Sequence, residues 1–412
     1  MPGKEQNPKK ILYVENGIGY GGAIICLRHL VRNLDQSKFT PLVVTGRTGP
    51  DYQGIAKESR WKHIPDRYVE FNNIKAVVEK RDTIKKIPGL TTVINQLLAR
   101  ADDVVNFLPF FIRLLHVVIL FKPDLIHANN EPLCNRAAVF AGKLMNIPVI
   151  CHIRGDQKGS AMMKWLYQLP DHFITVSRWV SESIGKLGVP ASKRTVIYDG
   201  ISFDSIDFHA DGQTFRKKFN IQPDDFTVGL IGMLIPWKGQ EIFLDAAKIL
   251  KYKIPNLRMM IIGRAPDEFR QFEEKLKQRV RHENLTDLII FTGHQTDMDA
   301  VYNGVDIAVS ASTSPEPLGT MVIETMAMGR PLIAPAHGGG AEMTDHEKTG
   351  LLFTPGDAKD LADAILKFHE NPRLRTDLGN AAKQKALHAF SVEAHVKNVQ
   401  AVYDTLLNKT SK

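Results

Sequence analysis

The 412-residue sequence is too long for one ordinary core and predicts two domains of about 200 residues each. Its three cysteines form neither a CxxC pair nor a zinc-ligand spacing, which indicates a reducing compartment and argues against a disulfide framework or a structural zinc site. The polar start MPGKEQNPKK does not read as a signal peptide, so we expect a cytoplasmic protein.

Charge is divided unevenly along the chain. Residues 1–200 carry 28 Lys and Arg against 17 Asp and Glu, a net +11, whereas the remainder carries 25 against 28. A basic first half suggests an anionic partner, either lipid or a phosphorylated acceptor, although a solvated surface with no charged partner explains it as well. Nucleic acid is the weakest of these partners and is not expected, because no basic run is interleaved with aromatic residues.

Short β-branched runs alternate with amphipathic stretches along most of the chain, which predicts βαβ units and parallel sheets. We expect strands at 11–15, 41–45, 124–128, 148–152, 173–176 and 195–198, and then at 227–231, 258–262, 288–292, 307–310 and 331–334. Both halves therefore predict a doubly wound α/β domain, and an Asp-, Gly- and Pro-rich stretch at 200–225 predicts the linker between them.

Residues 60–122 depart from this alternation, since they are long for one connection between strands. They end in VVNFLPFFIRLLHVVILFKP, an apolar run close to the length of a membrane span. However, Asn106, Arg113 and His116 are spaced to share one helical face, and Pro109 interrupts the run. A helix packed on the first domain and a helix lying on a membrane surface both fit this pattern, and a true span fits less well.

A glycine-rich turn follows the first predicted strand. Gly17, Gly19 and Gly22 satisfy GxGxxG, the pattern that lets a pyrophosphate approach the backbone at a helix start. A nicotinamide cofactor also needs an acidic residue at the end of the second strand, where this chain has only Arg47. We therefore expect no cofactor here, but the turn can still accept anionic oxygens.

The densest pattern lies in residues 306–356. A predicted strand leads into a Ser/Thr/Pro loop, then Glu316-Pro-Leu-Gly-Thr, then a helix that contains Glu324. Two carboxylates eight residues apart can accept hydrogen bonds from sugar hydroxyls, while the free amides of the helix start can face a phosphate. For each of these two glutamates, the alternative is that its negative charge only stabilises the first turn of the helix.

These blocks resemble the retaining, GT-B-fold glycosyltransferases of family 4 (glycosyltransferases group 1). The Glu-x7-Glu spacing, GRPLIAPAHGG and TGLLFTPGD match, as do GMLIPWKGQE, IIGRAPDE, FTGHQTDM and VYNGVDIAVS upstream. The resemblance covers nearly all of 225–390 and is thinner in GGAIICLRHLVRNL, PDLIHANN and VICHIRGD. It implies two Rossmann-like domains facing across a cleft: an acceptor-binding domain at 1–205, a nucleotide-sugar domain at 206–390, and a C-terminal helix at 391–412 that crosses back to the first.

The resemblance also implies roles for single residues. Glu324 is expected on the nucleotide ribose, Glu316 on the donor sugar, and Lys238 on the diphosphate. His152 matches the active-site histidine, with a packed strand-end histidine as the alternative, so the expected catalytic residues are His152, Glu316 and Lys238. The other expected substrate-binding residues are Gly21, Gly22, Arg154, Gly232, Arg264, His294, Leu318, Gly319 and Thr320.

Met233 departs from the family pattern, because many relatives have an arginine in that position. Either Lys238 and the helix amides suffice for the phosphates, or Arg154 or Arg264 substitutes. Asp297-Met-Asp299 spells a DxD motif but precedes a predicted helix, where acidic residues act as caps, so no metal site is expected.

The sequence thus predicts a transferase that moves a sugar from a UDP- or GDP-linked donor to an acceptor, either lipid-linked or part of an envelope polysaccharide. The basic first domain suggests peripheral contact with the inner face of a membrane. A nucleotide-sugar epimerase or a phosphorylase of the same fold is the nearest alternative, and an NADP-dependent oxidoreductase is a weaker one.

Overall fold

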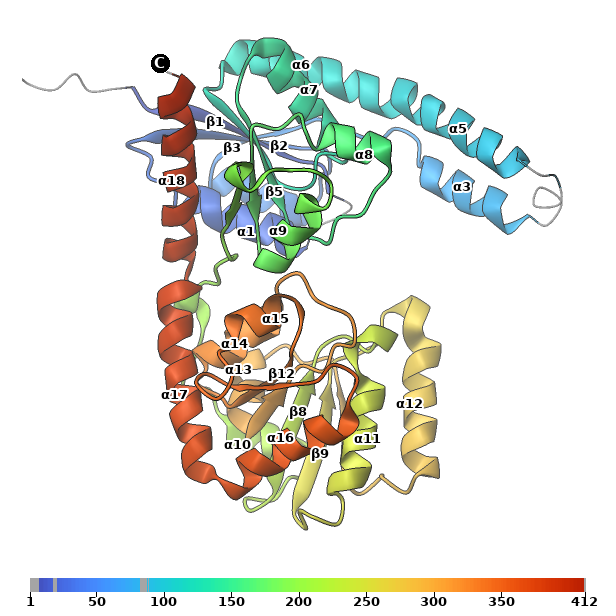
Figure 1. Cartoon of the computed structure of the whole chain (residues 1–412), viewed down its shortest axis with the longest axis vertical. Helices are drawn as coiled ribbons and strands as arrows, with labels where there is room; N and C mark the ends of the chain where they lie inside the picture. Colours follow the sequence, from blue (N-terminus) through green and yellow to red (C-terminus); the bar gives the residue numbers. More distant parts are fainter. Residues whose placement is uncertain (1–6, 18–20, 82–86, 88, 411–412) are drawn as a thin grey trace, which may run out of the picture. The chain divides into compact units, whose positions relative to one another are not determined.

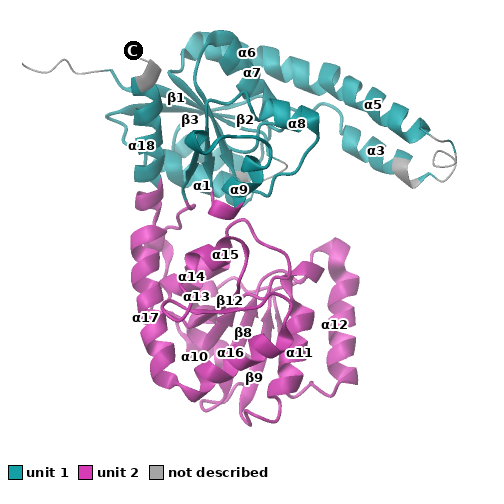
Figure 2. Cartoon of the chain, viewed as in Figure 1, with its two compact units in different colours: residues 1–175, 180–197, 396–412 teal, residues 176–179, 198–395 magenta. Residues whose placement is uncertain are grey.

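A computed structural model describes residues 7–17, 21–81, 87 and 89–410 of the chain. The chain forms two compact units, coloured separately in Figure 2. Unit 1 comprises the chain up to Thr175, Val180–Ile197 and the stretch from Val396 onward, and unit 2 comprises Val176–Trp179 and Tyr198–His395.

Unit 1 is built on a parallel sheet in which the described strands have the order β3-β2-β1-β4-β5-β6-β7 (Figure 1). These strands are β1 Lys9–Glu15, β2 Phe39–Thr45, β3 Arg60–His63, β4 Leu125–Ala128, β5 Val149–Ile153, β6 His172–Thr175 and β7 Arg194–Val196. The helices include α1 Gly22–Arg32, α2 Pro50–Gln53, α3 Phe71–Lys80, α5 Leu90–Asp102, α6 Leu108–Phe121, α7 Arg136–Met145, α8 Ala161–Leu166, α9 Arg178–Gly185 and α18 Val392–Thr410. The apolar run of β1 is buried throughout, as expected for a parallel sheet covered on both faces.

Unit 2 is built on a second parallel sheet, with its described strands in the order β10-β9-β8-β11-β12-β13. They are β8 Phe226–Ile231, β9 Leu257–Ile262, β10 Ile289–Gly293, β11 Ile307–Val309, β12 Leu332–Pro335 and β13 Leu351–Phe353. The helices include α10 Gly212–Lys218, α11 Gln240–Leu250, α12 Arg270–His282, α13 Met298–Gly304, α14 Thr320–Ala327, α15 Gly338–Met343, α16 Ala358–Glu370 and α17 Pro372–Ala389. Phe243 and Leu244 of α11 join Leu361 and Phe368 of α16 in its core.

Both sheets reverse their strand order at one place, between β1 and β4 in unit 1 and between β8 and β11 in unit 2. This is the order typical of dinucleotide-binding doubly wound sheets, which bind ligands beyond the carboxyl ends of the strands at the point of reversal. The predicted fold class, two Rossmann-like α/β domains, is confirmed. The topology also indicates where each unit would hold a ligand.

Two strands were missed, and one expectation is wrong. Strands β3 and β13 were not predicted, because β3 reads RWKH, which lacks a β-branched run, and β13 has only three residues. The proposed linker at 200–225 is wrong, since it contains α10 and belongs to unit 2. Its Asp-, Gly- and Pro-rich composition reflects turns around a short helix whose Phe215 is buried.

The apolar segment of unit 1 forms one long helical stretch, in which α5 and α6 are joined by a π-helix at Asp103–Phe107 (Figure 1). Phe110, Leu114 and Val117 of α6 are buried, so α6 packs on unit 1 as one alternative predicted. Asn106 and Arg113 both bond Tyr68 and so share one side of the stretch, as predicted, although Asn106 is buried and Arg113 and His116 are exposed. The π-helix widens the turn that contains Asn106.

Asn106 fixes this stretch to the segment after β3. Its Oδ1 accepts from the backbone N–H of Tyr68 at 2.7 Å, and its Nδ2 donates to Val69 O at 2.8 Å and to Asp102 Oδ1 at 2.8 Å. These bonds satisfy a buried amide and hold the wide turn in place.

The last helix, α18, begins in unit 2 and continues in unit 1 (Figure 2). Within unit 1, Tyr403 Oη lies 2.6 Å from His127 Nδ1 and donates to Tyr13 Oη at 3.1 Å. All three side chains are fully buried, so these bonds tie the end of the chain to strands β1 and β4.

Candidate functional site

The point of reversal in unit 2 brings together two of the predicted catalytic residues. Lys238 follows β8 in a 3-10 turn at Pro236–Lys238, and Glu316 lies on the loop after β11. Lys238 Nζ lies 2.7 Å from Glu316 Oε2, and each side chain keeps 18% of its surface exposed. The side chain of Ser312 donates to the other carboxylate oxygen of Glu316. A cation and an anion thus share a partly open position at the ligand-binding edge of the sheet.

The glycine run at the start of α15 holds the Glu316 loop from behind. Gly339 N donates to Glu316 O at 2.8 Å, and His337 Nε2 lies 2.9 Å from Ser312 O. Gly338 has φ +66°, and a Cβ there would lie 2.7 Å from Glu316 N and O. Only glycine permits this close approach, which explains the predicted GRPLIAPAHGG block in structural terms.

Helix α14 begins directly after this loop. Gly319 is its N-cap with φ +94°, and no side chain described in the structure caps the first turn. Val322 N donates to Gly319 O at 2.9 Å, so the amides of Thr320 and Met321 before it are the ones with which the start of α14 can bind an anion. Leu318 lies on the adjoining loop, as the sequence predicted.

Glu324 lies one turn further along α14 and is mostly buried. Tyr302 Oη donates to Glu324 Oε2 at 2.6 Å. Burial raises the pKa of the Glu324 carboxyl above 4.5, and the hydrogen bond from Tyr302 opposes that shift. One oxygen of the Glu324 carboxyl group is therefore held by Tyr302. Glu324 also belongs to α14, the helix whose first amides come directly after the Glu316 loop.

A hollow of about 460 Å³ lies at the carboxyl ends of β8, β9 and β10. Gly232, Met233, Arg264 and His294 are among its lining residues, so three predicted binding residues meet there with the residue that replaces the family arginine. A Cβ built on Gly232 would lie 3.8 Å from Lys238 Cδ, which places the hollow beside the Lys238–Glu316 pair. The volume is in the usual range for small-molecule sites.

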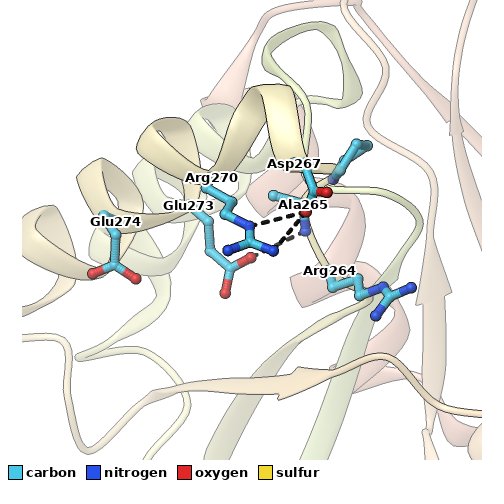
Figure 3. A pocket seen from close by; sticks show the side chains of 7 residues that line it. Arg264, Ala265, Asp267, Arg270, Glu273 and Glu274 are labelled. Carbon is cyan, nitrogen blue, oxygen red and sulfur yellow. Dashed lines mark hydrogen bonds and ion pairs between the residues drawn. The ribbon is translucent and has the colours of Figure 1, made fainter.

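A larger hollow of about 700 Å³ lies next to α12 (Figure 3). Arg270 bonds Asp267 at 2.6 Å, and Glu273 accepts from Ala265 N at 3.0 Å. In Figure 3 the guanidinium of Arg264 points away from the carboxylates of Glu273 and Glu274. The acidic lining is unfavourable for a diphosphate, so the smaller hollow is the better candidate.

The point of reversal in unit 1 holds a buried chain of polar residues. Asn129, after β4, donates from Nδ2 to Glu15 Oε2, and its Oδ1 accepts from Arg154 Nη1 at 2.7 Å. Arg154 Nη2 lies 3.3 Å from His152 Nδ1. Burial raises the pKa of the Glu15 carboxyl, against the hydrogen bonds that it accepts. The predicted His152 and Arg154 are thus linked to Glu15 and Asn129, which the sequence analysis did not single out.

The glycine turn of unit 1 leads into α1, with Gly21 as its N-cap. A Cβ on Gly21 or Gly22 would meet nothing within 4 Å, so no described atom crowds this helix start. Gly19 lies outside the described residues. Roles for Gly21, Gly22 and His152 toward the donor stay predictions.

The DxD sequence acts as a helix cap. Asp297 Oδ1 accepts from Ala300 N at 3.0 Å at the start of α13, and Asp299 Oδ2 accepts from Asp207 N at 2.8 Å. The capping interpretation of Asp297 is therefore confirmed. Among the residues that the structure describes, no group of three or more metal-ligating side chains occurs.

Comparison with known families agrees with this geometry. Residues 211–385 match the family model "Glycosyl transferases group 1", and residues 20–205 match "Glycosyltransferase Family 4". Over 266 residues the chain is 28% identical to the lipopolysaccharide core biosynthesis mannosyltransferase LpsB of Rhizobium meliloti, covering 64% of this chain and 74% of that protein. It is 26% identical to the putative glycosyltransferase EpsD of Bacillus subtilis over 319 residues, 73% of this chain and 81% of that one.

Solved structures share the fold over almost the whole chain. The structure of HepE from Anabaena in complex with UDP aligns with a TM-score of 0.78 and 21% identity, covering 96% of this chain and 100% of that chain. A glycosyltransferase from Rickettsia africae aligns with the same TM-score at 19% identity, covering 98% and 99%. Together the two family models span most of the sequence.

Proposed function

The chain belongs to the group 1 glycosyltransferases with the GT-B fold, and from this premise we propose that it transfers a hexose from a UDP- or GDP-linked donor with retention of configuration. The observation that carries the proposal is the Lys238–Glu316 pair beside the hollow at the end of β8. The relatives support the donor class, since LpsB bears the name of a mannosyltransferase and HepE was solved with UDP and with UDP-glucose.

The donor diphosphate is proposed to lie between Lys238 and the start of α14. The Lys238 ammonium and the amides of Gly319 and Thr320 would stabilise the charge that develops on the leaving phosphate. Glu316, which pairs with Lys238 in this structure, would then accept hydrogen bonds from the sugar hydroxyls. Arg264 and His294 would line the nucleotide end, and the free Glu324 oxygen would accept from the ribose.

Retention requires the acceptor hydroxyl to approach from the face that the diphosphate leaves. In this proposal no protein nucleophile takes part, and the leaving phosphate oxygen accepts the acceptor proton. The reaction then depends on fixed donors around the phosphate, each of which is typically worth about 3 kcal/mol. His152 is proposed to lie beside the sugar, held in place by Arg154.

The acceptor is proposed to bind unit 1. A hollow of about 420 Å³ lies between the ends of β1, β3 and β4 and helices α3 and α5. Asn16, Asp66 and Glu131 give it a polar side, and Phe107 and Leu133 give it an apolar one. Such a lining suits an amphipathic acceptor, so we propose a lipid-linked sugar used in envelope polysaccharide assembly at the cytoplasmic face of a membrane.

A panel of UDP-, GDP- and ADP-sugars tests the proposal directly. Donor hydrolysis by the purified chain selects the donor, and NMR of the product formed with a simple sugar acceptor gives its anomeric configuration. We expect one donor to be consumed faster than the others and its configuration to be kept. An inverted product would overturn retention, and epimerised donor without transfer would overturn the transferase assignment.

A further inference from the structure

Helix α5 has apolar residues but no packed core of its own. None of its residues Leu90–Asp102, all of which the structure describes, is buried. Its neighbour α3 lies alongside it in Figure 1 and exposes Ile74 and Val77. A helix pair of this length normally buries one apolar face against the protein, so this face is open to another partner.

The open face continues into the next helical segment. Val93 and Leu97 of α5 are four residues apart, as are Val104, Leu108 and Ile112 beyond it, and all five are exposed. Residues four apart lie on one side of a helix, so each segment carries an apolar stripe. We call the helix pair α3 and α5 the hairpin. We call the exposed apolar row formed by Val93, Leu97, Val104, Leu108 and Ile112 the hairpin stripe. Helical geometry makes Leu90–Phe121 about 48 Å long.

By length and composition, Leu90–Phe121 is long and apolar enough to contact a membrane along its exposed side. Its most apolar window of 18 residues has a mean hydropathy of 2.2, and only 33% of that window is buried. The opposite side of α6 packs on unit 1 through Phe110, Leu114 and Val117, so the helix is held on the domain by one face and exposes the other. That arrangement suits a helix lying in a membrane surface better than one crossing it.

The charges around the stripe favour an anionic surface. Residues 71–122 contain eight Lys and Arg against four Asp and Glu. Two of the acids are matched within the chain, because Arg136 Nη1 lies 2.7 Å from Asp103 and Arg136 Nη2 lies 3.5 Å from Asp102. Lys75 and Arg81 are exposed, and Arg100 is exposed but lies 3.3 Å from Asp103, so the positive charge of this region is carried mainly by Lys75 and Arg81 among these three. Like charge opposes pairing with a second copy of this chain and favours anionic lipid headgroups.

An exposed tryptophan lies near the base of the hairpin. The rings of Phe107 and Phe140 are 6.1 Å apart, and Phe140 lies 6.3 Å from Trp165. Trp165 of α8 is 55% exposed, and Met162, three residues earlier in the same helix, is also exposed. Tryptophan is enriched where one end of a side chain meets lipid and the other meets water.

We propose that the hairpin stripe along Leu90–Phe121, with Lys75 and Arg81, docks unit 1 on an anionic lipid bilayer. The inference rests on the proposed function and adds to it: a chain docked on the bilayer would take its lipid-linked acceptor directly from the membrane surface. Its test measures binding and not turnover, so docking and transfer can each fail alone.

The test is co-sedimentation of the full chain with vesicles of phosphatidylcholine, with and without about a third of phosphatidylglycerol. We expect the wild type to bind the anionic vesicles at about 0.05 M salt and to bind less at about 0.5 M. Leu97→Ser/Val104→Ser/Ile112→Ser should lower the bound fraction by about tenfold or more. Lys75→Glu/Arg81→Glu should remove the preference for anionic lipid.

Tyr252→Ser is the matched control, because Tyr252 is 86% exposed and lies in unit 2. It should bind as the wild type does, and all variants should keep the wild-type circular dichroism and donor hydrolysis. Absence of vesicle binding by the wild type, or undiminished binding by the stripe variant, would overturn docking. A wild-type dimer that the stripe variant converts to monomer, without vesicle binding, would assign the face to a second copy instead.

Discussion

The two points of strand reversal use polar side chains in opposite ways. In unit 1, Glu15, Asn129 and His152 are buried and joined through Arg154 by hydrogen bonds inside the protein. In unit 2, Lys238 and Glu316 are joined by one contact and remain partly exposed beside a hollow. The sheets have the same order, so the difference comes from the loops after the strands.

We interpret this contrast as a division of roles, in which the polar residues of unit 1 position one another and those of unit 2 bind the ligand. A buried network is costly to break, because each lost partner leaves a polar group unsatisfied, and it therefore fixes His152 in one orientation. The Lys238–Glu316 pair keeps 18% of each side chain exposed, so a phosphate can reach Lys238 and replace Glu316 without leaving the lysine unpaired. We expect substitutions in unit 1 to reduce stability first and substitutions in unit 2 to reduce turnover first.

The largest effect is expected for Lys238→Ala, which should lower kcat by roughly two orders of magnitude or more, because one fixed cation on the leaving phosphate is lost. Steady-state kinetics with the preferred donor measures it. Lys248→Ala, which removes a half-exposed lysine paired with Asp245 on α11, is the control and should keep kcat. Turnover within about twofold of wild type for Lys238→Ala would remove that lysine from the site.

Asn129→Ala should lower the free energy of unfolding by about 3 kcal/mol, since buried Glu15 and half-buried Arg154 both lose their side-chain hydrogen bond to Asn129. Urea unfolding followed by tryptophan fluorescence measures the change. The control is Asn73→Ala, at an exposed position in α3, with an expected change within about 0.5 kcal/mol. If the two variants lose the same stability, the network does not hold unit 1 together.

A smaller and pH-dependent effect is expected for Glu324→Gln. Burial raises the pKa of Glu324 in the folded chain, so the folded state binds its proton more tightly than the unfolded state does. The stability from this carboxyl is therefore present below the unfolded pKa and is lost as pH rises through the folded pKa. The glutamine does not titrate but can still accept from Tyr302.

The difference in unfolding midpoint, wild type minus Glu324→Gln, should thus fall as pH rises from the ordinary carboxyl pKa through the raised pKa of folded Glu324. Glu370→Gln, at an exposed position in α16, is the matched control and should show a flat difference. A flat difference for Glu324→Gln as well would mean that its burial has no electrostatic consequence.

The fold could be predicted from sequence wherever burial controls residue choice. The strand at 11–15 reads ILYVE and was predicted because its apolar run is enclosed on both faces. Strand β3, RWKH, lies at a sheet edge with only partial burial, so its composition carries no strand signal. Helix α10 was mistaken for a linker because a seven-residue helix between turns has little periodicity.

The site was predicted in part. Family resemblance indicated Lys238 and Glu316, but nothing in their spacing of 78 residues shows that they pair, because the strand order creates that contact. Glu15 and Asn129 were missed, since an acid at a strand end and one asparagine of an Asn-Asn pair are common in loops. The signal that could have found them is their position, each at the end of a strand beside the reversal.

The central claim is that Lys238 binds the donor diphosphate at the reversal point of unit 2. Calorimetric titration of UDP and of uridine, or of GDP and guanosine, into wild type and Lys238→Ala tests it most directly. We predict that the wild type binds the diphosphate more tightly than the nucleoside, and that Lys238→Ala loses most of that difference while nucleoside binding stays the same. An equal preference for the diphosphate in both proteins would place the phosphates elsewhere.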